Sequence, residues 1–211
     1  MMLPEKSISV DDRLAQIVSV IFHPILMPVY GLMIIFTAPA LYGYLPFQVK
    51  KVITFIVIVD NVLLPLILIT YFRYRRMISN WTIDDRRERI IPLITTSFFY
   101  LFTVYLIYRF HIPIFIKSFI ICCAVLAVAV TIINFWYKIS LHATGAGALT
   151  ALVMVLSIRM QAPVALLVII VILASGLVMS SRLWLKAHTA GEVWSGFMLG
   201  SLGSGLCLGL L

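Results

Sequence analysis

The chain contains few charged residues. They make up 11% of its 211 residues, and hydrophobic residues make up 63%, whereas ordinary soluble domains have about 25% and roughly 45–50%. This deficit excludes a sizeable soluble domain. Several apolar runs reach the roughly 20 residues that a helix needs to cross a bilayer core of about 30 Å. The composition predicts an all-α fold, a polytopic transmembrane helical bundle that forms one integral-membrane domain over residues 1–211.

Cysteine is also scarce. The three cysteines, Cys122, Cys123 and Cys207, lie within apolar runs, where neither a disulfide framework nor the ligand spacing of a zinc site is expected. We interpret them as packing residues. The first fourteen residues contain three acids and no cleavage-type pattern, so we expect no removable signal peptide. The net charge of +8 is typical of basic helix ends that meet lipid phosphates, and we expect no nucleic acid as a partner.

Seven hydrophobic segments are separated by short polar clusters. They cover approximately residues 15–38, 52–72, 90–110, 115–137, 142–158, 162–180 and 189–210. The first contains His23, Pro24 and Pro28, so it is expected to be broken or re-entrant. The fifth is short. The sequence therefore predicts six to seven membrane segments.

Three polar clusters precede the third, fifth and seventh segments, and so emerge on the side of the N-terminus. They are 73–92, 138–142 and 181–188. Each lies where a helix begins, and the free N–H groups of a helix N-terminus favour anions. Eleven basic residues lie on this side, but six belong to the predicted site, which leaves five against five opposite. The clusters indicate a site for a negative group, while the positive-inside rule leaves its orientation open.

The last cluster has the most constrained spacing. His188 and Glu192 are four residues apart, so on a helix they share a face, and the carboxylate can hold one imidazole nitrogen. A nucleophilic or proton-transferring histidine needs this pairing. Arg182, expected in the connecting segment, can bind two phosphate oxygens with its planar guanidinium. Ser181 adds a hydroxyl.

The second cluster adds another histidine. His142 is expected to open a helix, and Lys138 and Ser140 flank it with a cation and a hydroxyl. Two histidines among cations suit phosphoryl transfer through a phospho-histidine, in which the second histidine protonates the leaving oxygen. The alternative is a metal site, because His142, His188 and Glu192 form a ligand set that zinc accepts. The surrounding basic residues argue against a cation, so we expect no metal and no cofactor.

These clusters resemble the signatures of the type-2 phosphatidic acid phosphatase superfamily. The third signature of that family is S-R-x5-H-x3-D. Ser181, Arg182 and His188 match it, and Glu192 stands in place of the Asp. The change is chemically mild, since Glu keeps the charge and adds one methylene.

The two other signatures are matched less completely. ISLH at 139–142 is similar to the second signature, P-S-G-H, and keeps its Ser and His. DDRRERIIP at 84–92 only partly resembles the first signature, K-x6-R-P, because Asp84 and Ile91 stand at the Lys and Arg positions. The order and spacing of the clusters fit the family over a motif-bearing core of about 84–192.

The resemblance assigns a role to each matched residue. It implies that His188 is the nucleophile, Glu192 its activating partner and His142 the acid for the leaving group. It also implies that Arg182 and Ser140 contact the phosphate. Because the first signature has no aligned cations, further phosphate ligands are candidates by charge alone: Lys138, Arg86, Arg87 and Arg89.

Members of this family typically need no metal and, when membrane-embedded, remove phosphate from lipid phosphates or polyprenyl diphosphates. The resemblance therefore implies a metal-independent membrane phosphatase with such a substrate and with membrane lipids as partners. We expect a multi-pass protein of the bacterial inner membrane. The incomplete first signature leaves open a non-catalytic relative that binds anionic lipid headgroups.

Two features lie outside the signatures. Asp60 is an ionisable residue inside the second segment, which indicates either a functional residue or a member of an interior hydrogen-bond network. Gly196 and Gly200 form a G-x-x-x-G stripe in the last segment. We expect this stripe to pack within the monomer, while a homodimer stays open.

Overall fold

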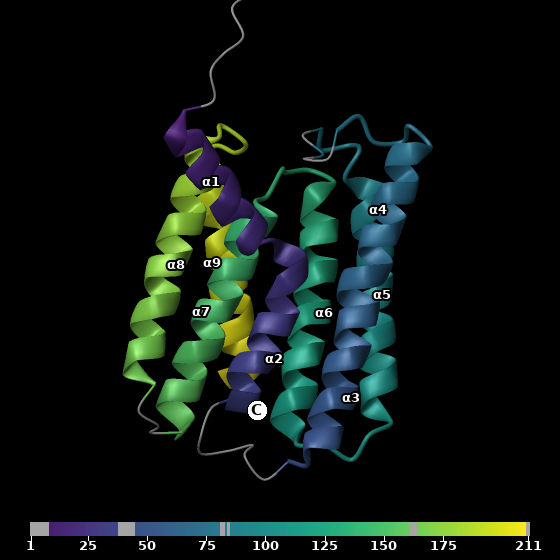
Figure 1. Ribbon diagram of the computed structural model, residues 1–211, viewed down its shortest axis with the longest axis vertical. Coiled ribbons are helices and arrows are strands. Elements are labelled where there is room, and N and C mark those ends of the chain that lie inside the picture. Colours follow the sequence, from purple (N-terminus) through teal and green to yellow (C-terminus); the bar gives the residue numbers. More distant parts are fainter. Residues whose placement is uncertain (1–8, 38–44, 81–82, 84, 161–163, 210–211) are drawn as a thin grey trace, which may run out of the picture.

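The computed structural model describes residues 9–37, 45–80, 83, 85–160 and 164–209. Within these ranges the chain is helical, and long helices run up and down to form a bundle (Figure 1). The elements are α1 (Val10–Ile21), η1 (Pro24–Leu26), α2 (Met27–Thr37), α3 (Phe47–Ile58), η2 (Val59–Leu63), α4 (Leu64–Tyr74), α5 (Ile90–Tyr108), α6 (Ile114–Asn134), α7 (Leu141–Met160), α8 (Ala165–Trp184) and α9 (Ala190–Gly209). The predicted all-α bundle is confirmed for the described residues.

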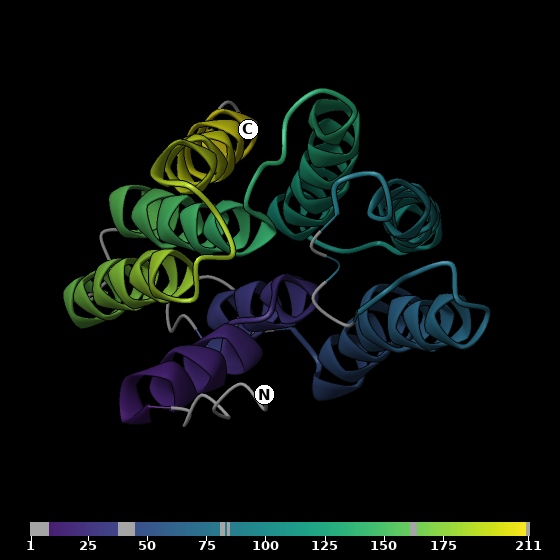
Figure 2. The same ribbon diagram turned by 90° about the horizontal axis from the view of Figure 1, so that it is seen from above.

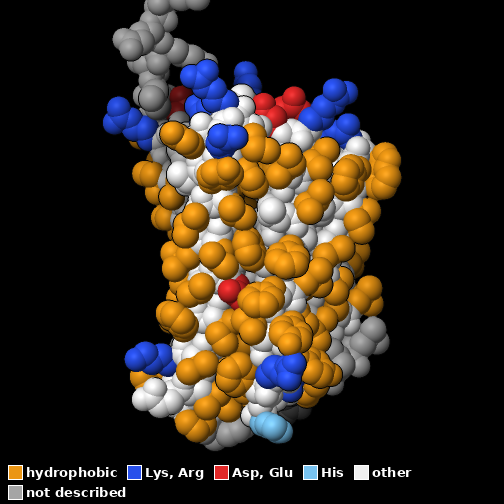
Figure 3. All heavy atoms as spheres, turned by 90° about the vertical axis from the view of Figure 1, so that its right-hand side faces the viewer, with side chains coloured by type: hydrophobic (Ala, Val, Ile, Leu, Met, Phe, Trp, Pro, Cys, Tyr) orange, Lys and Arg blue, Asp and Glu red, His pale blue; other side chains and the backbone are white. Residues whose placement is uncertain are grey.

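Six spans are long and apolar enough to cross a membrane. They are Val10–Thr37, Phe47–Tyr74, Ile90–Tyr108, Ile114–Asn134, Leu141–Ile158 and Ala165–Trp184. The last helix, α9, runs the length of the bundle beside them (Figure 1) but is not one of the six. On the face shown in Figure 3, apolar side chains form a wide band, and Lys and Arg gather at both ends of it. This distribution is that of an integral, multi-pass membrane protein.

The first span is broken where the sequence predicted a break. It begins earlier than expected, at Val10, because Ser9 and Asp12 form a capping box in which each side chain binds the other's backbone N–H. Helix α1 ends at Ile21. Pro24 then starts the short 3-10 helix η1, since proline has no N–H with which to continue the preceding helix.

The second span contains an irregularity that the sequence did not reveal. Residues Val59–Leu63 form a π-helical turn between α3 and α4. Asp60 and Asn61 are buried there, and the Thr103 hydroxyl on α5 lies 3.2 Å from Asp60 Oδ2 and 3.0 Å from Asn61 Oδ1. Asp60 therefore belongs to an interior hydrogen-bond network between the second and third spans.

Helix α7 lies between α8 and α9 (Figure 2), and glycines bring it close to α9. A Cβ atom added at Gly196 would lie 2.6 Å from the Ser140 carbonyl oxygen, and one at Gly200 would collide with the Thr144 carbonyl oxygen. The G-x-x-x-G stripe thus packs within the monomer, as small residues do where two membrane helices approach closely. This packing sets the N-terminal end of α7 beside that of α9.

Candidate functional site

The three polar clusters lie at one end of the bundle, near the described N-terminal residues (Figure 1). A cavity of about 330 Å³ opens there. Its basic and imidazole side chains are those of His23, Arg89, His142, Arg182 and His188. The rest of its wall is largely apolar and comes from α2, α4, α5, α6 and α7, with residues such as Met27, Leu66, Phe119, Leu126 and Leu149. The cavity therefore joins a cationic end to an apolar interior.

His188 is held in place by the way α8 ends. The amide of Lys186 donates to the Leu183 carbonyl at 3.0 Å, and that of Ala187 donates to the Arg182 carbonyl at 3.2 Å. Lys186 has a φ of 52°, in the left-handed region. These features form a Schellman motif with lysine where glycine is usual. The motif turns the chain so that buried His188 faces the cavity.

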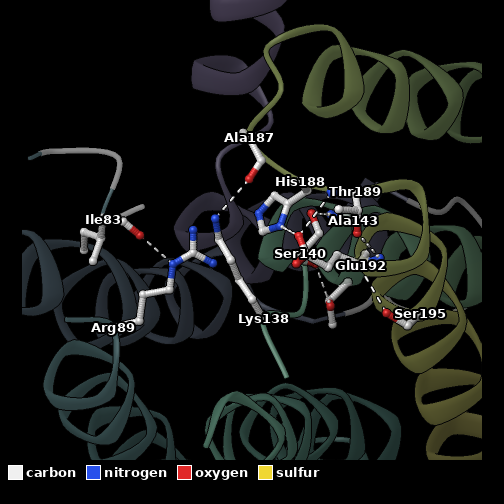
Figure 4. Close-up of polar contacts among 11 residues, drawn as sticks. Ile83, Arg89, Lys138, Ser140, Ala143, Ala187, His188, Thr189, Glu192 and Ser195 are labelled. Atoms are coloured by element: carbon white, nitrogen blue, oxygen red, sulfur yellow. Dashed lines mark hydrogen bonds and ion pairs between the residues drawn. The ribbon is translucent and has the colours of Figure 1, made fainter. Parts of the chain in front are cut away.

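His188 and Glu192 form the predicted pair. His188 Nδ1 donates to Glu192 Oε2 at 2.8 Å (Figure 4). The histidine lies just before α9 rather than on it, so the pair joins a loop to a helix. Glu192 Oε2 also accepts from the Thr189 amide at 3.2 Å, and the Glu192 amide donates to Thr189 Oγ1 at 3.3 Å. This reciprocal capping box fixes the carboxylate.

The pair leaves one nitrogen of His188 for chemistry. With its proton on Nδ1, the neutral ring carries a lone pair on Nε2. Burial lowers the pKa of His188 to about 4, and the charges of Arg89 and Arg182 act in the same direction, while the contacts with Glu192 oppose them. His188 is therefore unprotonated at neutral pH, the state that a nucleophilic histidine needs.

Arg182 and His142 are both tied to the first span. Arg182 lies in the last turn of α8 rather than in the connecting segment, is buried, and its Nη1 donates to the Ser19 hydroxyl at 3.2 Å. His142 lies in the first turn of α7, and its Nε2 donates to the Ser19 carbonyl at 3.1 Å. The carbonyl can only accept, so it fixes the proton on Nε2 and leaves Nδ1 of His142 for a transferred proton.

Arg89 is the cation of the first cluster that lines the cavity. It is buried at the start of α5, and its Nε donates to the Ile83 carbonyl at 2.6 Å. Its guanidinium extends toward His188 (Figure 4). Arg89 thus brings positive charge to the site although the Arg position of the first signature is Ile91.

Two other candidates, Lys138 and Arg86, bind protein groups and are not among the residues that line the cavity. Lys138 Nζ donates to the Ala187 carbonyl at 3.2 Å, next to His188 (Figure 4). Arg86 Nη1 donates to the Phe135 carbonyl at 2.6 Å. These contacts anchor the two loops that frame the site.

Ser140 caps α7 and joins it to α9. It is fully buried, its hydroxyl accepts from the Ala143 amide at 3.4 Å, and its own amide donates to the Glu192 carbonyl at 3.1 Å. Arg87 is exposed. The structure thus gathers His142, Arg182, His188 and Arg89 at the cavity and gives Ser140 a supporting position.

Two residues of the site were not singled out from the sequence. Ser19 binds both Arg182 and His142, and His23 lines the cavity with its ring centroid 5.4 Å from that of His142. The His-Pro pair that interrupts the first segment was the available signal. It was interpreted only as a break.

The alternative metal site finds no matching geometry. Among the residues that the structure describes, no three His, Cys, Asp or Glu side chains come together as a metal would require. His142 binds the Ser19 carbonyl, whereas Glu192 binds His188. The basic and imidazole groups that line the cavity are three histidines and two arginines.

No family model, no curated protein and no solved structure matches the chain.

Proposed function

We propose that this protein is an integral-membrane phosphatase that removes phosphate from a lipid phosphate or a polyprenyl diphosphate through a phospho-histidine. The observation that carries the proposal is the His188–Glu192 pair. The 2.8 Å bond from Nδ1 leaves Nε2 as the nucleophilic atom of a buried histidine beside two arginines. A nucleophile oriented by a carboxylate is the arrangement that covalent phosphoryl transfer needs.

The first step forms a bond between His188 Nε2 and phosphorus. The bond from phosphorus to the leaving oxygen breaks. In this step His142 starts doubly protonated, a form that a bound phosphate anion stabilises, and it gives its Nδ1 proton to the leaving oxygen, which returns the ring to the neutral form with its proton on Nε2. Water then attacks the phospho-histidine, His142 takes up a proton, and inorganic phosphate and free His188 result. Arg89 and Arg182 stabilise the charge that develops on the phosphoryl oxygens, which is the main contribution of a protein to such transfers.

The mixed lining of the cavity supports this substrate class. Arginines and histidines line one part and apolar residues of five spans line the remainder. A phosphorylated lipid matches both, with its phosphate at the cations and its chain between the helices. The protein would act in the bacterial inner membrane, where both substrate classes are available, and membrane lipids would surround its apolar band.

Purified full-length protein in detergent tests the proposal. Phosphate release is measured with phosphatidic acid, phosphatidylglycerol phosphate and undecaprenyl diphosphate. We expect release from at least one of them, inhibition by orthovanadate and no effect of EDTA. His188→Ala should abolish release, whereas His111→Ala, an exposed histidine in the loop between α5 and α6, should leave it unchanged.

Other outcomes identify the alternatives. Equal release by the wild type and His188→Ala would refute the enzyme, and loss of release with EDTA would indicate a metal-dependent hydrolase. A protein that binds anionic lipid vesicles without releasing phosphate would be a non-catalytic relative. This second candidate function, the non-catalytic relative, is favoured by the incomplete first signature. Asp84 and Ile91 stand there in place of the Lys and the Arg.

A further inference from the structure

The break in the first span brings a third histidine to the cavity. His23 lies between α1 and η1 and lines the same cavity as His142, His188, Arg89 and Arg182. No part of the phosphoryl-transfer scheme uses it. Because proline follows, the His23 backbone is extended, with φ −64° and ψ 134°. The ring position is therefore determined by a rigid local turn.

The local hydrogen bonding of His23 fixes its protonation. Its Nδ1 accepts from the Ile25 amide at 3.3 Å, which caps η1. An imidazole nitrogen that accepts carries no proton, so the neutral ring has its proton on Nε2. Nε2 lies on the ring edge away from the Ile25 amide. It is the nitrogen that remains for a ligand in the cavity.

The neighbours of His23 are those that a phosphate would meet. Its ring stands at 80° to that of His142, in an edge-to-face arrangement. One turn earlier on α1, the Ser19 hydroxyl binds Arg182 and the Ser19 carbonyl binds His142. The broken span thus presents a neutral N–H donor within a group of cations. Such a donor adds directional recognition of an oxyanion without further like-charge repulsion.

We propose that His23 is a phosphate-binding residue whose Nε2–H donates to a phosphoryl oxygen of the substrate, so that the broken first span completes the site. The inference rests on the proposed function. It assigns the first span to recognition of the phosphate, in addition to the clusters before α5, α7 and α9.

Two substitutions separate this role from capping. His23→Asn keeps a favoured capping side chain for η1 but is too short to place a donor where Nε2 lies. His23→Gln reaches that position with its amide. Orthovanadate binding to the full-length protein in detergent is measured by titration calorimetry, with kcat and KM for the preferred substrate and the melting temperature alongside. His111→Asn serves as the matched control.

We expect His23→Asn to weaken vanadate binding about tenfold to a hundredfold, since a hydrogen bond to a charged group is lost. Its melting temperature should stay that of the wild type, and His23→Gln should recover part of the affinity. Wild-type vanadate affinity in His23→Asn would overturn the inference. So would a loss of affinity that follows the melting temperature in both variants.

The same experiment distinguishes the two proposals. A wild type that binds vanadate but releases no phosphate from any substrate refutes the phosphatase, and the comparison of His23→Asn with His23→Gln still decides the role of His23. A wild type that neither binds vanadate nor releases phosphate overturns both.

Discussion

Removing the charge of Glu192 should slow catalysis without unfolding the site. In Glu192→Gln the side chain keeps its size and one acceptor oxygen, but the acceptor of the 2.8 Å bond from His188 Nδ1 becomes neutral. A hydrogen bond to a charged group contributes about 1.5–3 kcal/mol and one between neutral groups about 0.5–1.5 kcal/mol. The difference of about 1–2 kcal/mol corresponds to a roughly five- to thirtyfold lower kcat. The loss falls on kcat because the ring becomes positive as Nε2 attacks phosphorus.

Thr189→Ala is the matched control. It removes the hydroxyl that accepts from the Glu192 amide at 3.3 Å but leaves the pair with His188 in place. Loss of a helix cap costs about 0.5–2 kcal/mol, so this variant should melt at a lower temperature and keep its kcat. Phosphate release under saturating substrate and thermal unfolding in detergent measure the two effects. A wild-type kcat in Glu192→Gln together with a reduced kcat in Thr189→Ala would refute the role given to the carboxylate.

Two further predictions concern charge and packing. The acidic limb of kcat/KM should lie near pH 4, because burial lowers the pKa of His188 to about 4 and only the unprotonated ring attacks phosphorus. Arg89→Gln should move this limb to higher pH, since it removes a charge that lowers the pKa, and an unmoved limb would contradict the proximity of the two residues. Gly200→Ala should destabilise the protein by about 1–3 kcal/mol through overpacking against α7, whereas Gly205→Ala, whose Cβ meets nothing within 4 Å, should not. Equal melting temperatures of these two variants would count against the close packing of α7 on α9.

The fold was predictable from the sequence because a bilayer restricts the choices. Long apolar runs must be helices there, since each backbone N–H and C=O needs a partner. The break at Pro24 was also predictable, because proline ends a helix. The π turn around Asp60 was not, since it depends on Thr103 from another span. No local signal announces that contact.

The site was predictable to the extent that its residues are close in the chain. The spacing of His188 and Glu192 predicted their contact. The two residues do not share a helix face, however, because His188 lies in the loop before α9 and a capping box holds Glu192. The choice between Arg86 and Arg89 depends on the path of the loop before α5, which charge alone does not determine. Ser19 lies 123 residues from His142. Such a contact follows from packing of the spans and leaves no pattern in the sequence.

Helix α9 is less apolar than the membrane-spanning helices, and it carries Glu192, the carboxylate partner of His188. Helix α9 is not among the six spans that length and composition mark as membrane-crossing, yet its first turn holds Glu192. Lipid alone therefore favours its insertion less than that of its neighbours, and its glycines stabilise it by fitting α7. The contact that places α9 against α7 also brings Glu192 to the site. His188 therefore gains its carboxylate partner only when α9 has docked against α7, so a chain that lacks α9 would leave the His188 ring without the group that orients it.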